Sequence, residues 1–270
     1  MTDLPLFEAG LNLFSAQFAA DRFELLQRSR DANVRYQLCI ASDLDEARQN
    51  LEVCRSHPDV LSTAGVHPHQ AAKVSEGWLT ELSALLAEPQ VRAIGECGLD
   101  FNRMFSPAQQ QIDVFEAQLQ LAATSQKPVY LHERDALDTQ LSLLRNQQIQ
   151  HGIAHCFTST RQAMAAYLDL GLYIGITGWV CDERRGMDLQ EAVRYLPLDR
   201  LILETDAPYL LPRNLTDKPK SRRNEPAFLP AIAAMVAGLK QCPIEQVLQA
   251  AWHNSCRLFQ VEAADVATMA

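Results

Sequence analysis

The sequence predicts a (β/α)8 TIM barrel of the α/β class. Short apolar runs rich in β-branched residues alternate with longer segments of helical periodicity, which is typical of strands and helices around a parallel sheet. Eight such runs occur in 270 residues, close to the usual length of one barrel. The phosphate loops G-x-G-x-x-G and G-x-x-x-x-G-K-[ST], which favour an open doubly wound sheet, do not occur. Without a linker or a further repeat, residues 1–270 are predicted to form a single domain.

The elements follow one another along the chain. The predicted strands are Leu4–Leu13, Val34–Ala41, Val60–Val66, Val91–Cys97, Pro128–His132, Gly152–Phe157, Leu172–Thr177 and Leu201–Asp206. Between the fourth and the fifth, Pro107 suits the first turn of a helix with Ser106 as its N-cap. Apolar residues then recur at helical spacing from Ile112. Helical segments around Leu229–Leu239 and Ile244–Trp252 complete the outer ring.

Charge and composition exclude several classes of protein. With 24 Lys plus Arg against 33 Asp plus Glu, the formal charge is −9, which argues against a protein that coats duplex DNA or an anionic membrane. The segment Pro212–Pro226 has five basic and two acidic residues, so positive charge gathers there. Seven cysteines without a C-x-x-C pair, no signal-peptide pattern and no bilayer-long apolar run lead us to expect a cytoplasmic protein with no membrane partner.

Side chains that bind metals stand at the carboxyl ends of several predicted strands. They are His67, His69, Glu96, His132, His155 and Asp206. In a β/α barrel these strand ends share one face, where active sites are built. Imidazole and carboxylate together suit Mg²⁺, Mn²⁺ or Zn²⁺, each of which lowers the pKa of a bound water and polarises a phosphoryl or carbonyl oxygen. No H-E-x-x-H motif or G-x-S-x-G elbow offers a different enzyme chemistry.

Strand alternation assigns faces to two cysteines beside these ligands. Because neighbouring residues of a strand point to opposite faces, Glu96 is predicted to face the site and Cys97 the helices. By the same argument Cys156 faces the helices if His155 faces the site. Neither cysteine is therefore expected at the site.

Seven strings in order along the chain resemble the TatD family of metal-dependent deoxyribonucleases. They are STAGVHPH (62–69), AIGECGLDF (93–101), PVYLH (128–132), AHCFTST (154–160), YIGITGWV (173–180), LETDAPYLLP (203–212) and RRNEPAFLP (222–230). The resemblance extends from about Phe7 to Phe259 and is strongest to the member after which the family is named. It implies a metal-dependent hydrolase barrel of the amidohydrolase-like type with a divalent metal at its mouth. It also implies a 3′-5′ exonuclease that hydrolyses phosphodiester bonds of single-stranded DNA, with RNA left open as a second substrate, and a role in DNA repair or nucleic-acid turnover. A monomer is the default expectation.

The resemblance also implies roles for individual residues. Glu96, His132, His155 and Asp206 match the metal ligands, with Glu96 in the bridging position where two metals are present. Catalytic roles are expected for Asp206, which accepts or orients the proton of an attacking water, for Glu96, and for His67, which donates to a phosphate oxygen. The predicted substrate-binding residues are His67, His69, Arg222, Arg223 and Asn224.

The chain departs from the wider family on the first strand. Most members have an H-x-H pair there, whereas this chain has Gly10 and Asn12, as the eponymous member does. The second metal position is left with Glu96, Asp206 and the amide oxygen of Asn12 as candidate ligands. Oxygen ligands favour a hard ion, so we expect Mg²⁺ and a weak or substrate-assisted second metal.

Other functions are compatible with parts of the same pattern. A small-molecule or aminoacyl-ester amidohydrolase would use the same metal site. Such sites often have a carboxylated lysine on the fifth strand, and no lysine stands at the end of PVYLH. A non-catalytic nucleic-acid-binding protein is opposed by the charge and by the complete set of ligands. For strand recognition, Arg184 and Arg185 are expected either to contact the strand or to pair with Asp182 and Glu183. The candidate stacking platforms are Phe101, Phe157, Trp179 and Tyr209.

Overall fold

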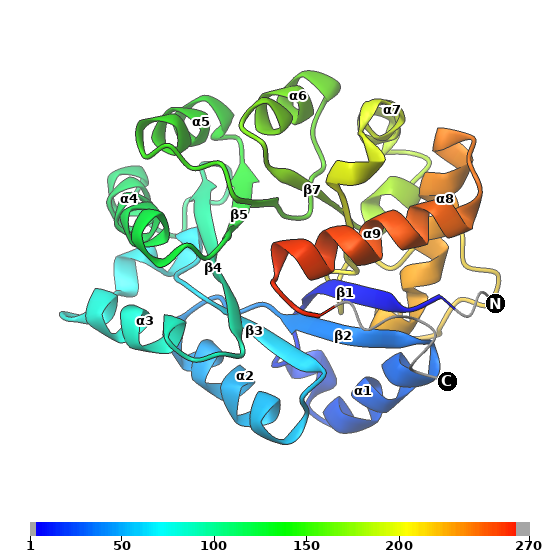
Figure 1. The fold of residues 1–270 in the computed structure, drawn as a ribbon, viewed down its shortest axis with the longest axis horizontal. Coiled ribbons are helices and arrows are strands. Elements are labelled where there is room, and N and C mark those ends of the chain that lie inside the picture. The colour runs from blue at the N-terminus through cyan, green and yellow to red at the C-terminus, as the bar shows by residue number, and fades with distance from the viewer. Residues whose placement is uncertain (1–3, 263–270) are drawn as a thin grey trace. The chain divides into compact units, whose positions relative to one another are not determined.

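A computed structural model of the chain describes residues 4–262. Eight strands, parallel in every pairing whose register is resolved, form one sheet in the order β1 to β8 and alternate with helices, which confirms the predicted (β/α)8 barrel (Figure 1). The strands are β1 Leu6–Leu11, β2 Val34–Cys39, β3 Val60–Ala64, β4 Val91–Asp100, β5 Val129–Arg134, β6 Gly152–Ala154, β7 Tyr173–Ile176 and β8 Leu201–Leu203.

Nine α-helices and five 3₁₀ helices lie in the described residues. The α-helices are α1 Arg22–Asp31, α2 Leu44–Ser56, α3 Trp78–Leu86, α4 Ala108–Ser125, α5 Leu137–Asn146, α6 Arg161–Asp169, α7 Met187–Tyr195, α8 Leu229–Lys240 and α9 Ile244–Leu258. The 3₁₀ helices are η1 Ala16–Phe18, η2 Pro68–Lys73, η3 Gly178–Cys181, η4 Leu198–Arg200 and η5 Pro226–Phe228. The predicted helix between the fourth and fifth strands and the two after the eighth are confirmed as α4, α8 and α9.

The described chain divides into two compact units. The first takes its residues from Met1–Leu38, Cys156–Ala165 and Ile174–Ala270, and the second consists of Cys39–His155 and Ala166–Tyr173. That residues 1–270 form a single domain stays a prediction.

In the second unit, β3, β4 and β5 approach one another very closely. A Cβ on Gly65 would lie 2.5 Å from the Cα of Gly95, and a Cβ on Gly95 would lie 2.3 Å from the carbonyl oxygen of Tyr130. Only glycine leaves room for such contacts between strands. Helices α2, α3 and α4 cover the outer side of these strands (Figure 1). The glycines therefore bring the ends of three strands together.

In the first unit, α9 packs along β1 and β8 (Figure 1). Phe7 stacks on Phe259 with ring centroids 5.5 Å apart, and Trp252 stacks on Tyr36 at 5.8 Å. The side-chain amide of Asn254 donates to the carbonyl oxygens of Leu198 and Leu201 at 2.8 Å each. The last helix thus fixes the start of β8.

The predicted N-cap of α4 is wrong by one residue. Pro107 is the cap, and Ser106 lies before the helix. The buried Ser106 hydroxyl donates to the carbonyl oxygen of His69 and accepts from the backbone N–H of Ala72. Its hydrogen bonds therefore hold η2, which carries His69, instead of starting α4.

Membrane-spanning potential is limited among residues 4–262. No single helix there is long and apolar enough to cross a bilayer, although residues 226–240 and 244–258 reach that length and composition together as a pair bent by 115°.

Candidate metal centre and active site

In the second unit, three imidazoles converge on one carboxylate oxygen, Oε1 of Glu96. His132 Nδ1 lies 3.0 Å from this oxygen, His67 Nε2 3.5 Å and His155 Nε2 3.9 Å. Glu96 lies in β4, His132 lies in β5, and His67 and His155 follow β3 and β6. The structure therefore brings together four of the site residues that the sequence predicts.

Local backbone geometry aims Glu96 into this cluster. The pairing of β4 with β5 shifts register between Ile94 and Cys97, and the N–H of Glu96 donates to the carbonyl oxygen of Ala41 at 3.0 Å. The Cys97 thiol lies instead 3.7 Å from the carbonyl oxygens of Ile94 and Tyr130, fully buried. The predicted opposition of Glu96 and Cys97 is confirmed.

Each of the two predicted histidine ligands has an outer partner. The second ring nitrogen of His132, Nε2, lies 3.2 Å from Oδ2 of Asp100, and Nδ1 of His155 lies 2.6 Å from the hydroxyl of Tyr130. Histidines that ligate metals usually bond their other nitrogen to a carboxylate or a similar partner, which fixes the ring orientation. Because the remaining nitrogens point toward Glu96, this donor set fits a divalent cation.

Asp100 is a site residue that the sequence analysis missed. Its buried carboxylate contacts His69 Nε2 at 2.7 Å as well as His132, and it accepts the backbone N–H groups of Asn102 and Arg103 at 3.1 and 2.9 Å. Burial would raise the pKa of Asp100, but these hydrogen bonds hold it below its usual range. Asp100 belongs to the string AIGECGLDF and lies four residues after Glu96. This place within a motif was the feature of the sequence that could have indicated it.

The protonation states of the cluster follow from these contacts. Burial lowers the pKa of His67, whose Nδ1 accepts the backbone N–H of His69 at 3.0 Å, so neutral His67 has its proton on Nε2. His132 lies between two carboxylates, which outweigh burial and raise its pKa. Burial alone would raise the pKa of Glu96, yet His67 and His132 lower it well below its usual value. The centre is therefore an ionised carboxylate surrounded by imidazoles.

His69 is part of the same cluster of histidines. Its ring packs edge-on against His67 with centroids 4.3 Å apart, and His67, His69 and His132 offer ligand atoms that all lie within 4.8 Å of one another. Because Asp100 holds the Nε2 atom of His69, the ring is fixed in place.

Asp206 lies in the first unit, after β8, beside residues that follow β1 and β6. Its Oδ1 accepts the side-chain N–H of Asn12 at 2.9 Å, and its Oδ2 lies 3.8 Å from Sγ of Cys156. Asn12 also donates to the carbonyl oxygen of Ala207 at 3.2 Å. The sequence led us to expect the amide oxygen of Asn12 as a metal ligand, whereas its amide nitrogen faces and orients Asp206.

The predicted orientation of Cys156 is wrong. Its thiol lies beside Asp206 and 3.7 Å from Oγ1 of Thr177, and is not directed toward the helices. Strand β6 ends at Ala154, and Cys156 has a positive φ of 44°, so the alternation of a regular strand no longer applies at this position. Its backbone N–H donates to Oε1 of Glu204 at 3.0 Å.

The predicted substrate-binding residues of the basic segment have different environments. Arg222 is exposed and forms no ion pair with another described residue. Arg223 contacts Asp21 and Glu225 at 2.7 Å each. The buried Asn224 donates from Nδ2 to the carbonyl oxygen of Thr205 at 2.9 Å. Arg223 and Asn224 therefore anchor the segment, whereas Arg222 has no ion-pair partner among the described residues.

The other expectations for strand recognition are partly confirmed. Arg184 and Arg185 pair with Asp182, at 3.6 and 3.1 Å, while Glu183 pairs with Arg213. The Arg185 guanidinium lies 4.5 Å from the centroid of the Trp179 ring, so it covers one of its faces. Of the four proposed stacking platforms, Phe157 is buried and Tyr209 is exposed.

This barrel, with carboxylate and imidazole donors at its strand ends, defines a metal-dependent hydrolase. The sequence model of the TatD related DNase family matches residues 7–260. A protein named 3′-5′ ssDNA/RNA exonuclease TatD, from Salmonella typhimurium, is 50% identical over 234 residues, which cover 86% of this chain and 90% of the relative. The protein of the same name from Edwardsiella piscicida is 46% identical over 259 residues, covering 95% and 100%.

Solved structures agree with this similarity. A TatD homologue from Escherichia coli, YjjV, has a TM-score of 0.89 at 26% sequence identity and covers 97% of this chain and 100% of that chain. The chain belongs to the TatD related DNase family. It is therefore a metal-dependent hydrolase that acts on phosphodiester bonds.

Proposed function

We propose that this protein is a Mg²⁺-dependent 3′-5′ exonuclease that hydrolyses single-stranded DNA and RNA. The observation that carries the proposal is the convergence of His67, His132 and His155 on Oε1 of Glu96. The names of relatives about 50% identical to the chain support the substrate and the polarity. A role in DNA repair or nucleic-acid turnover, as a cytoplasmic monomer, is the corresponding proposal for the cell.

The proposed metal ligands are Glu96, His132, His155 and Asp206. Bound there, a divalent cation would neutralise charge on the phosphoryl oxygens and lower the pKa of an attacking water. Carboxylates with two imidazoles accept Mn²⁺ and Zn²⁺ as well as Mg²⁺. We favour Mg²⁺ because Gly10 and Asn12 add no imidazole to the first strand.

Two residues have direct roles in the proposed reaction. His67, neutral and protonated on Nε2, donates a hydrogen bond to a non-bridging phosphate oxygen. Such a fixed donor stabilises charge that develops in the transition state. Asp206 accepts the proton of the attacking water, and Asn12 holds its other oxygen in place.

His69 and Asp100 act on the site indirectly. The backbone N–H of His69 fixes the tautomer of His67, and Asp100 orients both His69 and His132. We therefore treat His69 as a residue that positions His67, in addition to its proposed contact with substrate.

A gel assay with single-stranded oligonucleotides tests the proposal. Removal of single nucleotides should release a 3′ label at once and shorten a 5′-labelled strand stepwise, with Mg²⁺ present and not with EDTA. Duplex DNA should be a poorer substrate. Glu96→Ala should abolish the reaction, and full nuclease activity of that variant in a clean preparation would refute the assignment. Faster cleavage of an aryl carboxylic ester than of DNA would favour the amidohydrolase alternative.

A further inference from the structure

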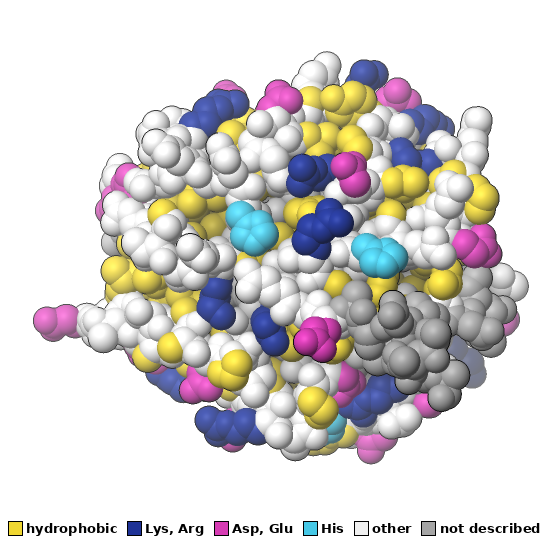
Figure 2. All heavy atoms as spheres, viewed as in Figure 1, with side chains coloured by type: hydrophobic (Ala, Val, Ile, Leu, Met, Phe, Trp, Pro, Cys, Tyr) yellow, Lys and Arg dark blue, Asp and Glu magenta, His cyan; other side chains and the backbone are white. Residues whose placement is uncertain are grey.

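A groove lined by cations lies in the first unit, between η3 and the segment that follows Asp206. Its volume is about 720 Å³. Its lining includes six basic residues and one acidic residue: Arg184, Arg185, Arg213, Lys218, Lys220, Arg222 and Asp182. In a chain with a net charge of −9, this concentration of positive charge is local. By contrast, the face in Figure 2 shows basic side chains dispersed among acidic ones.

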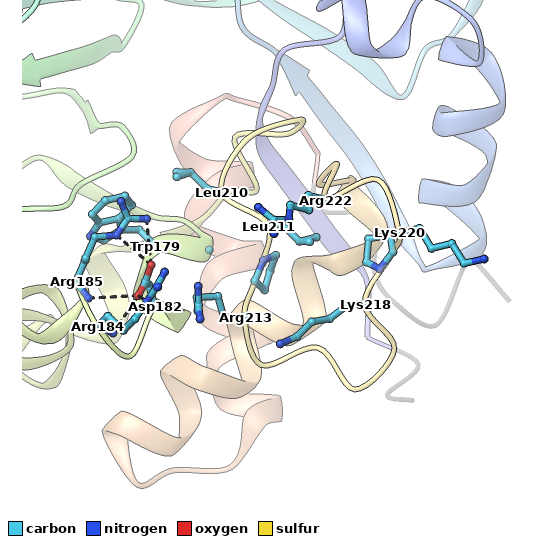
Figure 3. A pocket seen from close by; sticks show the side chains of 13 residues that line it. Trp179, Asp182, Arg184, Arg185, Leu210, Leu211, Arg213, Lys218, Lys220 and Arg222 are labelled. Atoms are coloured by element: carbon cyan, nitrogen blue, oxygen red, sulfur yellow. Dashed lines mark hydrogen bonds and ion pairs between the residues drawn. The ribbon is translucent and has the colours of Figure 1, made fainter.

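The cations of the groove fall into two groups, which Figure 3 shows on its two sides. On one side, Arg184 and Arg185 are held by Asp182, and Arg213 pairs with Glu183. On the other side, the exposed Lys218, Lys220 and Arg222 form no ion pair with any residue that the structure describes. Figure 3 shows Lys218 and Arg222 directed toward the groove and the end of Lys220 directed away from it. Within residues 4–262, Lys218 and Arg222 thus have no acidic partner.

The wall that presents these two cations is anchored at both ends. The side-chain amide of Asn224 bonds to the backbone of Thr205, and Arg223 is tied to Asp21 and Glu225. At the other end, Gly178 lies so close to Leu210 that a Cβ would come within 1.9 Å of the Leu210 carbonyl oxygen. The wall is therefore held in place before a ligand arrives.

The groove starts close to Asp206, which lies in the same unit. Leu210, which lines it, comes four residues after Asp206, and the backbone N–H of Tyr209 donates to the carbonyl oxygen of Asp206 at 2.9 Å. Leu210, Leu211 and Pro219 add apolar groups to the lining beside the cations. A groove with spaced cations and apolar surface suits a single polynucleotide strand, because the cations contact phosphates and the apolar groups contact sugars and bases.

We propose that this groove binds the strand on the 5′ side of the bond to be cleaved, with Lys218 and Arg222 each contacting one phosphate. The inference rests on the proposed exonuclease function, because only an enzyme that acts at the 3′ end keeps the rest of the strand on its 5′ side. The groove would act on affinity and on retention of the strand, and not on the chemical step.

Binding measured without hydrolysis tests the groove separately from the nuclease reaction. Anisotropy of a labelled dT12 strand in EDTA is followed at several salt concentrations for the wild type, the double variant Lys218→Ala/Arg222→Ala, and the control Arg35→Ala/Arg257→Ala. The control removes the same charge from exposed positions outside the groove, in β2 and α9. Hydrolysis of bis(p-nitrophenyl) phosphate, which has no upstream phosphate, is then measured with Mg²⁺.

The groove variant should bind dT12 about tenfold more weakly at low salt. The slope of log affinity against log salt concentration should fall in magnitude by about 1.4, because each of the two lost phosphate contacts accounts for about 0.7. Its kcat/KM for the small diester, which has no upstream phosphate, should fall much less than its affinity for dT12. The proposal is overturned if the groove variant behaves like the control, if the small diester is affected equally, or if the wild type does not bind dT12. Groove-dependent binding of dT12 by a protein that hydrolyses neither DNA nor the small diester would refute the exonuclease proposal and the assignment to the 5′ side, and would leave only a groove that binds single strands.

Discussion

Two buried glutamates, one in each unit of the chain, have opposite protonation states. Glu96 in β4 is surrounded by imidazoles, which lower its pKa well below the usual value and keep it ionised. Glu8 in β1 is fully buried, with no cation among the described residues paired to it, and burial raises its pKa to about 8. Its Oε1 accepts the backbone N–H groups of Gly10 and Thr205, at 2.8 and 2.9 Å. The same side chain is therefore an ionised, proposed metal ligand in one region and a neutral structural group in the other.

The difference follows from which neighbours each strand end provides. The ends of β3, β4 and β5 contribute His67, Asp100 and His132 around Glu96, whereas β1 contributes Gly10 and Asn12. A buried charge is stable only with partners of opposite charge or strong donors. Around β1, where Gly10 and Asn12 supply no imidazole, the carboxyl groups of Glu8 and Asp206 accept hydrogen bonds instead. Four experiments test this contrast, beginning with the largest expected effect.

Substitution of Glu96 should have the largest effect. Glu96→Gln keeps the shape but removes the charge on which three imidazoles converge, so we expect metal affinity and kcat/KM to fall on the order of 1,000-fold. Titration calorimetry with Mn²⁺ and the oligonucleotide assay would measure both. Glu133→Gln, in the same sheet but outside the cluster, is the matched control and should keep its activity. Equal metal affinity in Glu96→Gln and the wild type would contradict the assignment.

Substitution of Glu8 should change the pH dependence of stability. Because its folded pKa of about 8 lies above the ordinary value of 4.5, the stability that protonated Glu8 contributes is fully present below pH 4.5 and is lost as the pH rises toward 8. Glu8→Gln stays neutral throughout. The difference in unfolding free energy, variant minus wild type, should therefore grow by roughly 3 kcal/mol between pH 4.5 and 7. Urea unfolding at several pH values would measure it, and a difference independent of pH would show that Glu8 is not protonated when folded.

Substitution of Asp100 tests the outer support of the imidazoles. Asp100→Asn keeps the size but removes the charge that orients His69 and His132, so metal affinity or kcat should fall 10- to 100-fold. Because Asp100 is proposed to act through the histidines, the KM for single-stranded DNA should change less than kcat. Asp135→Asn, in the loop after β5, serves as the control. A kcat unchanged from the wild type would mean that the histidines are oriented without Asp100.

Substitution of Asn12 should have the smallest effect. It tests the second metal position, which is expected to bind its ion weakly. Asn12→His restores one imidazole on β1, so the second metal should bind about tenfold more tightly, by comparison with the 10- to 100-fold effects that single groups have on metal sites. Stoichiometry and affinity for Zn²⁺ would be measured without substrate. The wild type should hold one metal tightly. Two tight Zn²⁺ ions in the wild type would refute the idea that the change at Gly10 and Asn12 weakens this position.

Much of the site could be predicted because it depends on local patterns. Apolar runs identified all eight strands, and a ligand-type residue at the end of a run identified Glu96, His132 and His155. Asp100 was missed because an acidic residue near a strand end has the same local appearance whether it contacts solvent or two histidines. Arg222 and Arg223 are neighbours in the sequence and look alike there. In the structure Arg223 is held by Asp21, some 200 residues away, and by Glu225, whereas Arg222 pairs with no described residue.

The sequence by itself determined the order of strands and helices, the kinds of donor at the strand ends, and membership of the TatD related DNase family. These properties follow from periodicity and from motifs that are continuous in the chain. Only the tertiary structure decided that Glu96 is ionised and Glu8 neutral, and that Cys156 lies beside Asp206. Protonation depends on burial and on charges brought together from distant segments, and the orientation of Cys156 depends on where β6 ends, so neither can be read from neighbouring residues alone.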